Sequence, residues 1–202
     1  PAGMATPALT TIARGKVSLA LIITTITAVL CPFTIPFLIK HYVGTQMAVS
    51  VTDMLFMLGK IIFIPFVVAI IVRKFAKEFI EKTKDYYSAF SIILIMPLIM
   101  GPLAKNSHYI LNNAEKIFPI LAYLFVVSAV LHFIGWIMVF WLNKKEKIAV
   151  SVTTAYFNNS LAIVFAAKFF GPLVVLAVIL YEIPWDLMLI PFKMITKRIS
   201  EK

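Results

Sequence analysis

The sequence predicts an all-α integral membrane protein with about six transmembrane helices and a further half-helix at its N-terminus. Apolar residues make up 61% of the 202 residues, charged residues make up 14%, and the mean hydropathy is +0.96. A soluble domain carries roughly a quarter charged residues. The apolar residues form long runs, and most of the basic residues lie in short segments between these runs.

Six apolar stretches are long enough to cross a membrane as helices. A span needs about 20 apolar residues, because a helix rises about 1.5 Å per residue through a hydrocarbon core of about 30 Å. Pro1–Ala13 is too short to span and is typical of the second half of a helix. Since the chain begins with Pro1, we expect the protein to continue upstream. The six stretches are Val17–Lys40, Met54–Val72, Tyr86–Ala104, Ile117–Leu142, Ile148–Phe170 and Leu173–Ile195.

Lysine and arginine are divided unequally between alternate loops, and this division predicts the orientation. Cytoplasmic loops carry the excess of basic residues, so we expect a multi-pass protein of the cell membrane with a cytoplasmic C-terminus. The same rule explains the net charge of +10; we therefore expect the lipid bilayer as a partner and no nucleic acid. The richer side holds Arg14, Lys16, Arg73, Lys74, Lys77, Lys82, Lys84, Lys144, Lys145, Lys147, Lys193, Lys197, Arg198 and Lys202, and the poorer side holds Lys40, Lys105, Lys116 and Lys168.

Ionisable residues within the predicted spans need a reason, because a charge at mid-membrane costs about 2.5–3.5 kcal/mol. Lys60 lies near the start of its span, where the side chain can reach the interface, and Asp53 lies at a span boundary. His132 indicates either a hydrogen bond between helices or a proton relay. Glu182 and Asp186 are four residues apart and share a helix face. They are candidates for ion or proton coupling, the alternative being interhelical hydrogen bonds.

The fifth span is unusually polar between Ser151 and Ala162. It contains Thr153 and Thr154, and then the adjacent pair Asn158 and Asn159. Non-helical backbone at membrane depth survives only where protein buries it or where it lines a wet cavity. Broken helices of this kind bind ions and substrates near the midplane of transporters. A polar packing seam is the alternative interpretation.

The first span carries a matching polar stripe. Thr24 and Thr27 are three residues apart and share one helix face. Hydroxyl-rich faces also occur at ordinary helix contacts in membranes. No catalytic motif competes with these features, and the three histidines lie in different segments. We therefore expect neither an enzyme nor an organic cofactor, and the single Cys31 allows no internal disulfide.

The order and spacing of these features resemble the bile acid/sodium symporter family, in its bacterial and archaeal branch. The resemblance covers essentially the whole chain. A short basic turn follows the first half-helix, and the break of the second broken helix lies at the paired asparagines. The pieces that carry the resemblance are Ala13-Arg14-Gly15-Lys16-Val17, Lys60-Ile61-Ile62-Phe63-Ile64-Pro65, Leu131-His132, Asn158-Asn159-Ser160-Leu161-Ala162 and Trp185.

The resemblance implies a fold of ten helices in two inverted repeats of five, with two broken helices that cross near the midplane. Residues 1–45 would then be the end of the first repeat, consisting of half a broken helix and one span. Residues 46–202 would be the whole second repeat, with its broken helix interrupted around 153–160. About a third of a full-length transporter would lie upstream.

The resemblance also implies a function, namely ion-coupled secondary active transport by alternating access. The expected solute is a small organic anion. We expect the substrate-binding residues to be Thr24, Thr27, Thr153, Thr154, Asn158 and Asn159. The expected ion-binding or coupling residues are Thr6, Thr24, Thr153, Glu182 and Asp186.

Sodium as the coupling ion is implied only in part. The Ser–Asn pair of the family falls on Thr6 and Pro7, so the hydroxyl is kept and the amide is lost. Of two hydroxyl positions on the next helix, Thr24 keeps one and Ala20 loses the other. Thr153 stands where the family has a Glu, and a hydroxyl supplies no negative charge to offset the desolvation of a cation.

Two alternatives remain open. The chain also resembles the arsenite efflux permeases more distantly, through the paired asparagines and a Glu before a Pro in the last helix; Pro1–Ala13 lacks the Cys that those proteins use. That similarity favours a proton-coupled exporter or antiporter acting through Glu182. The third candidate is a membrane receptor or assembly subunit that transports nothing. No oligomeric state is predicted.

Overall fold

The protein is helical throughout the part of the chain that the computed structural model describes, which is residues 1–43, 50–83 and 86–198. Within these ranges no β-strand forms, and the only β-type contact is an isolated antiparallel bridge between Ala2 and Phe157. The predicted all-α class is confirmed. Lys84 and Lys202, which the charge count used, lie outside the described residues.

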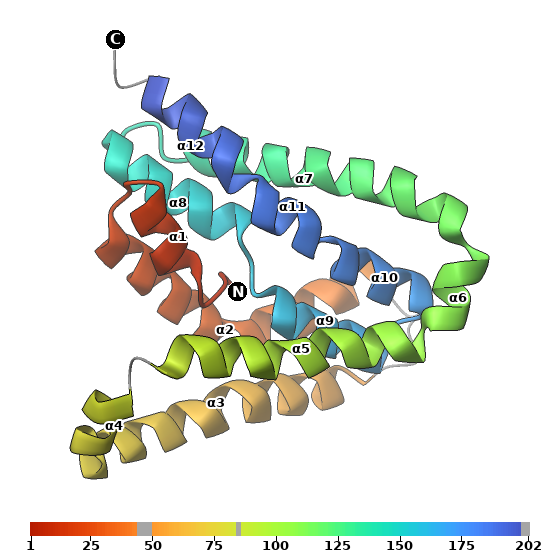
Figure 1. The fold of residues 1–202 in the computed structure, drawn as a ribbon, viewed down its shortest axis with the longest axis horizontal. Helices are drawn as coiled ribbons and strands as arrows, with labels where there is room; N and C mark the ends of the chain where they lie inside the picture. Colours follow the sequence, from red (N-terminus) through yellow and green to blue (C-terminus); the bar gives the residue numbers. More distant parts are fainter. Residues whose placement is uncertain (44–49, 84–85, 199–202) are drawn as a thin grey trace. The chain divides into compact units, whose positions relative to one another are not determined.

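The helices follow one another with short connections (Figure 1). The first six are α1 (Thr6–Ile12), α2 (Val17–Val43), α3 (Val51–Phe75), α4 (Lys77–Thr83), α5 (Tyr87–Lys105) and α6 (Ser107–Asn112). A single 3₁₀ turn precedes α7 (Ile117–Ile137). The remaining helices are α8 (Lys144–Ala155), α9 (Asn159–Phe169), α10 (Pro172–Leu180), α11 (Glu182–Leu187) and α12 (Leu189–Arg198).

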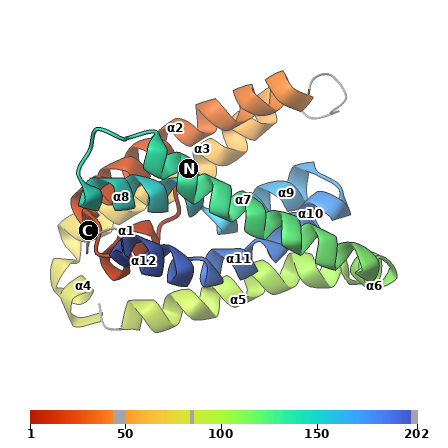
Figure 2. The same cartoon turned by 90° about the horizontal axis from the view of Figure 1, so that it is seen from above.

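Four helical stretches among the described residues are long and apolar enough to cross a membrane. They correspond to four of the six predicted spans. Of the other two, one forms the 19-residue α5, and the other is divided between α8 and α9. The last stretch consists of α10, α11 and α12, which follow one another in a row (Figure 2). The four stretches are Val17–Tyr42, Val51–Phe75, Ala114–Ile137 and Pro172–Arg198.

The described residues form two compact units, one of Pro1 and residues 26–96 and one of residues 2–25 and 97–202. In the first unit, Ser50 caps α3, because its Oγ accepts a hydrogen bond from the Asp53 N–H at 3.4 Å. Lys60 is exposed on α3, and Cys31 is a free, buried thiol. The assignment of residues 1–45 to a first repeat stays a prediction, since these units are defined by compactness and not by symmetry.

The second unit is built around α8. Gly135 lets α7 approach α8 closely, because a Cβ at this position would lie 2.7 Å from the Ser151 Cα. Helix α1 also packs on α8, α9 packs on α10, and α11 packs on α7. Two apolar clusters form the core of this unit. One contains Ala13, Ile148, Val152, Ala155, Tyr156, Leu189 and Phe192, and the other contains Ile163, Ala166, Val175 and Ile179.

Candidate functional site

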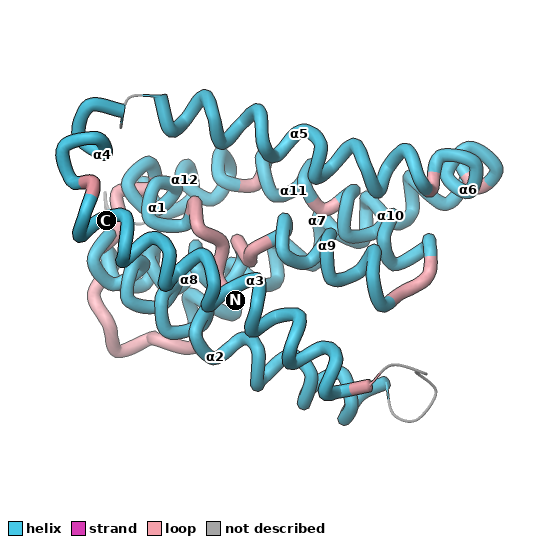
Figure 3. Tube along the Cα trace, turned by 90° about the horizontal axis from the view of Figure 1, so that it is seen from below, coloured by secondary structure: helices cyan, strands magenta, loops and turns pink. Residues whose placement is uncertain are grey.

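The predicted fifth span is interrupted between α8 and α9. Helix α8 ends at Ala155, the backbone leaves the helical region at Tyr156, and α9 begins at Asn159. Figure 3 shows this non-helical connection between the two helices. Asn158 sets the start of α9, because its Oδ1 accepts a hydrogen bond from the Leu161 N–H at 3.0 Å. The interruption lies within the residues 153–160 where the sequence predicts it.

A second non-helical segment, at the N-terminus, pairs with this break. Ala2 and Phe157 form the antiparallel bridge, and the Gly3 N–H donates a hydrogen bond of 2.7 Å to the Tyr156 carbonyl. Gly3 suits the close approach, since a Cβ at this position would lie only 3.0 Å from the Phe157 carbonyl oxygen. Two segments more than 150 residues apart therefore cross next to the ends of α1, α8 and α9.

Three donors satisfy the backbone carbonyls of the break. The Tyr181 hydroxyl donates to the Ala155 carbonyl at 3.1 Å, and the Trp185 indole N–H donates to the Phe157 carbonyl at 3.3 Å. Gly3 serves the carbonyl of Tyr156 between them. Because an unpaired polar group in a low-dielectric interior costs several kcal/mol, these donors stabilise the non-helical backbone of the break.

Two buried hydroxyls lie beside the crossing. The Oγ1 atoms of Thr6 on α1 and Thr24 on α2 are 2.7 Å apart. Thr6 also contacts the Gly3 carbonyl at 2.8 Å, and Thr24 contacts the Ala20 carbonyl at 2.8 Å. The Gly3 carbonyl also accepts a hydrogen bond from the Thr6 backbone N–H at 3.0 Å. We call these oxygens of Thr6, Thr24, Gly3 and Ala20 the hydroxyl cluster.

The four polar residues of the fifth span have separate local roles. Thr153 is buried and bonds to the carbonyls of Ala149 and Val150 in its own helix, and Thr154 bonds to Val150 in the same way. Asn158 caps α9. Thr27 lies further along α2, in the first unit, so its position relative to the crossing is not described.

Asn159 and Glu182 form a polar contact between α9 and α11. Asn159 is buried, and its Nδ2 donates to the Val178 carbonyl at 3.1 Å. The same amide is a hydrogen-bond neighbour of the half-buried Glu182 carboxyl. The Asn159 Oδ1 has no hydrogen-bond partner among the described residues. Asp186 is exposed, although it lies one turn from Glu182.

His132 packs between α7 and its neighbours. Its Nδ1 lies 2.8 Å from the Ser128 carbonyl in the same helix, and its own carbonyl accepts a hydrogen bond from Ser151 at 2.5 Å. The ring contacts those of Tyr156 and Phe192. These contacts favour the packing interpretation over the proton relay, because the ring faces aromatic groups.

Gly3 and Tyr181 were not predicted as site residues. Both act on the break through space, from segments distant in the sequence. The only local signal was the early Gly3 in a segment otherwise suited to a helix, and Tyr181 directly before Glu182. Among the described residues no group of three or more His, Cys, Asp or Glu side chains gathers to bind a metal ion.

In an all-helical membrane chain, a broken helix that pairs with a second non-helical segment is typical of secondary transporters with discontinuous helices. The comparison with protein families gives the same class: this chain belongs to the SBF-like CPA transporter family, whose model matches residues 5–198. This family match confirms the predicted relationship to the bile acid/sodium symporters. Membership of a transporter family also agrees with the expectation that the chain is not an enzyme.

A curated relative is found in Bacillus subtilis (strain 168), where it is named an uncharacterized sodium-dependent transporter, YocS. The two sequences are 24% identical over 180 residues, which is 86% of this chain and 54% of the relative. The chain therefore spans about half the length of the curated relative that it matches.

Proposed function

We propose that this chain is part of a sodium-dependent secondary active transporter that moves a small organic anion by alternating access. The observation that carries the proposal is the crossing of the two non-helical segments at Ala2–Gly3 and Tyr156–Phe157. Such a crossing costs backbone hydrogen bonds that an uninterrupted helix makes for itself, so a protein retains it where the helix ends serve a ligand. The name of the Bacillus relative supports sodium as the coupling ion.

The helix ends at the break suit both an anion and a cation. The N-terminus of α9 lies at Asn159 and presents the positive end of its helix dipole, which favours the carboxylate of a solute. The C-terminus of α8 lies at Ala155 and presents the negative end, which favours a cation. In the proposal the solute lies at the N-terminus of α9, with Thr153, Thr154, Asn158 and Asn159 near it. Thr24 and Thr27 of α2 remain predicted substrate-binding residues of the first span.

The hydroxyl cluster is the proposed sodium site. Hard cations take oxygen ligands, and the cluster brings four neutral oxygens close together. No carboxylate is among these four, in keeping with Thr153 where the related symporters have a Glu. Sodium binding would thus rest on neutral oxygens and on the dipole of α8, and we expect it to be weak.

The test is the thermal stability of the protein, expressed from its complete reading frame, in sodium chloride and in choline chloride. An ion that binds only the folded state stabilises that state by RT ln(1 + [L]/Kd), where [L] is the concentration of the free ion. We expect sodium to raise the melting temperature and Thr24→Val to abolish that rise. Thr25→Val is the matched control, because Thr25 is exposed and bonds only within its helix, to Leu21. Equal melting in both salts would overturn sodium coupling.

Transport itself is tested in liposomes by uptake of labelled organic anions under an inward sodium gradient. Uptake that collapses when the gradient is dissipated, and that fails in Thr24→Val but not in Thr25→Val, supports the proposal. Uptake of no solute by a protein that still binds sodium would favour the non-transporting receptor or assembly subunit.

A proton-coupled exporter is the second candidate, and Glu182 is the observation that favours it. Its carboxyl is half-buried on α11, in a stretch apolar enough to cross a membrane, and ionisable groups so placed commonly serve proton relays. The test is the melting temperature with and without sodium and at several pH values. A melting temperature that does not change with sodium but changes with pH, and that loses this pH dependence in Glu182→Gln, would support protons as the coupling ion. Asp186→Asn is the control, because Asp186 is exposed one turn away.

A further inference from the structure

A strongly basic hollow of about 450 Å³ lies in the second unit, away from the crossing. It lies between the end of α1, the first turn of α8 and the end of α12, which gather in Figures 1 and 2. Among the described residues, five cationic side chains line it and no carboxylate does. They are Arg14, Lys144, Lys145, Lys193 and Lys197.

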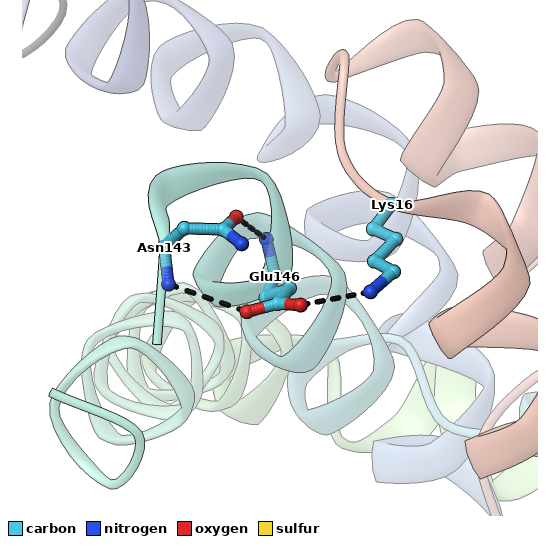
Figure 4. Close-up of polar contacts among 3 residues, drawn as sticks. All are labelled: Lys16, Asn143 and Glu146. Atoms are coloured by element: carbon cyan, nitrogen blue, oxygen red, sulfur yellow. Dashed lines mark hydrogen bonds and ion pairs between the residues drawn. The ribbon is translucent and has the colours of Figure 1, made fainter. Parts of the chain in front are cut away.

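The nearby carboxylate is already engaged by another cation. Glu146 accepts a hydrogen bond from the Lys16 ammonium at 2.8 Å and another from the Asn143 backbone N–H at 3.3 Å (Figure 4). The Asn143 side chain in turn accepts from the Glu146 N–H, which completes a capping box. Within the described residues the five cations of the hollow therefore have no ion-pair partner.

The positions of the lysines are unfavourable for the isolated chain. Lys144 and Lys145 lie in the first turn of α8, where the helix dipole favours negative charge. Lys193 and Lys197 are four residues apart on α12, so their like charges repel on one face. The positive-inside rule accounts for basic residues on this side of the membrane. It does not account for their convergence from three segments on one hollow.

Arg14 is held in a conformation that non-glycine residues rarely adopt. Its φ is 62°, in the left-handed region that follows many helices and that glycine usually occupies. The turn is closed by hydrogen bonds from the Arg14 N–H to Thr11 and from the Gly15 N–H to Thr10, at 3.0 and 2.8 Å. Glycine would fit the conformation with less strain. The arginine at the rim of the hollow therefore costs backbone strain that glycine would avoid.

We propose that this hollow binds a phosphate group, and that an anionic phospholipid headgroup is its natural source. Guanidinium and ammonium groups together suit the charge and geometry of phosphate oxygens. Exposed apolar side chains lie close in sequence to the residues that line the hollow, with Ile12 at the end of α1 and Ile190 and Met194 on α12. They offer a surface for acyl chains next to the headgroup, as basic pockets at the ends of transmembrane helices do. The inference does not depend on the transported solute.

The test is lipid binding by the protein in nanodiscs of phosphatidylcholine, with and without phosphatidylglycerol. We expect phosphatidylglycerol to raise the melting temperature, and Lys145→Gln/Lys197→Gln to reduce its affinity. At about 1 kcal/mol for each lysine the loss is roughly 30-fold for the pair. Lys105→Gln/Lys168→Gln is the matched control, because both lysines lie outside the hollow. An equal loss in both double variants would overturn the proposal.

A second measurement, with soluble phosphate compounds, distinguishes a lipid headgroup from free phosphate as the ligand. Inorganic phosphate or glycerol 3-phosphate is added to the protein in neutral detergent. Stabilisation by the soluble anions that Lys145→Gln/Lys197→Gln abolishes, with no response to phosphatidylglycerol, would keep the phosphate site and overturn the lipid as its source. No response to either ligand would overturn the site.

Arg14→Gly gives an independent readout with effects of opposite sign. The substitution relieves the left-handed backbone, so we expect a higher melting temperature in neutral detergent without phosphate. It also removes one cation, so we expect a weaker response to phosphatidylglycerol. A variant that is stabilised and keeps the full response would show that Arg14 does not take part in the site.

Discussion

The two ends of α8 are stabilised by opposite kinds of group. At its start, an ion pair takes part: Lys16 pairs with Glu146, which also forms the capping box with the neutral Asn143 amide. At its end, the donors are neutral: the Tyr181 hydroxyl at Ala155 and the Gly3 backbone N–H at Tyr156. The first end is partly open to solvent, and the second is buried.

The difference follows from the cost of burying charge. A charged donor at the break would pay a large desolvation penalty, whereas a hydroxyl, an indole and a backbone N–H satisfy carbonyls at a small one. At the start of α8 the charges keep their hydration and are weakened by screening instead. The two ends should therefore respond differently to substitution, salt and pH, with the larger effects at the buried end.

The largest effect is expected where α7 meets α8. Gly135→Leu places a side chain where even a Cβ would lie 2.7 Å from the Ser151 backbone, so we expect a loss of about 3 kcal/mol or more in unfolding free energy, or no folded protein. Melting in detergent and expression level measure it. Gly101→Leu is the control, because a Cβ at Gly101 has no neighbour within 4 Å. Similar losses in both variants would show that the close approach is unimportant.

Removal of one neutral donor at the break comes next. Tyr181→Phe leaves the Ala155 carbonyl without its hydroxyl donor, and we expect a loss of about 1–3 kcal/mol, because a buried acceptor is left unpaired. Denaturant titration in micelles measures the change. Tyr123→Phe, at an exposed tyrosine of α7, should change little. If the two variants unfold alike, the carbonyl at the break does not need this donor.

Loss of the cap at the other end of α8 should cost less. Asn143→Ala removes the acceptor for the Glu146 N–H, and we expect a loss of about 1 kcal/mol. Asn143→Ser keeps a hydroxyl acceptor and should restore most of the stability. Thermal melting of the three proteins gives the comparison, and a serine variant as weak as the alanine variant would exclude capping as the cause.

The smallest effect is the pH dependence at Glu146. The bonded Lys16 ammonium lowers the pKa of the Glu146 carboxyl below its ordinary value. A lowered pKa in the folded state gives stability that is complete above the ordinary carboxyl pKa and is lost as pH falls through the folded value. Glu146→Gln should therefore reduce the melting temperature slightly at pH 7 and flatten its fall towards pH 4.

The control for this measurement is Glu115→Gln, because Glu115 is exposed and has no ion pair in the described part of the chain. Added salt should shrink the difference between the wild type and Glu146→Gln, since the pair lies where ions screen it. A difference that survives molar salt would mean that the pair is more enclosed than its exposure indicates.

The break was predictable because its signal is local. Two adjacent asparagines and several hydroxyl residues within an apolar stretch disfavour a continuous membrane helix, and the interruption falls beside Asn158. The local hydrogen bonds of those residues were not predictable. Asn158 became a cap, and Thr153 and Thr154 bond within α8. Which face of a half-helix meets a cavity depends on packing that periodicity alone does not contain.

By itself, the sequence determined the helical membrane class and the positions of the apolar stretches, because hydropathy and length act over single segments. The resemblance also predicts Thr6 and Thr24 as ion-binding residues, and the structure places their hydroxyls 2.7 Å apart. Only the tertiary structure decided that Ala2 and Gly3 pair with Tyr156 and Phe157, and that basic residues of α1, α8 and α12 surround one hollow. These features join segments far apart in the chain, so they exist only once the helices have packed.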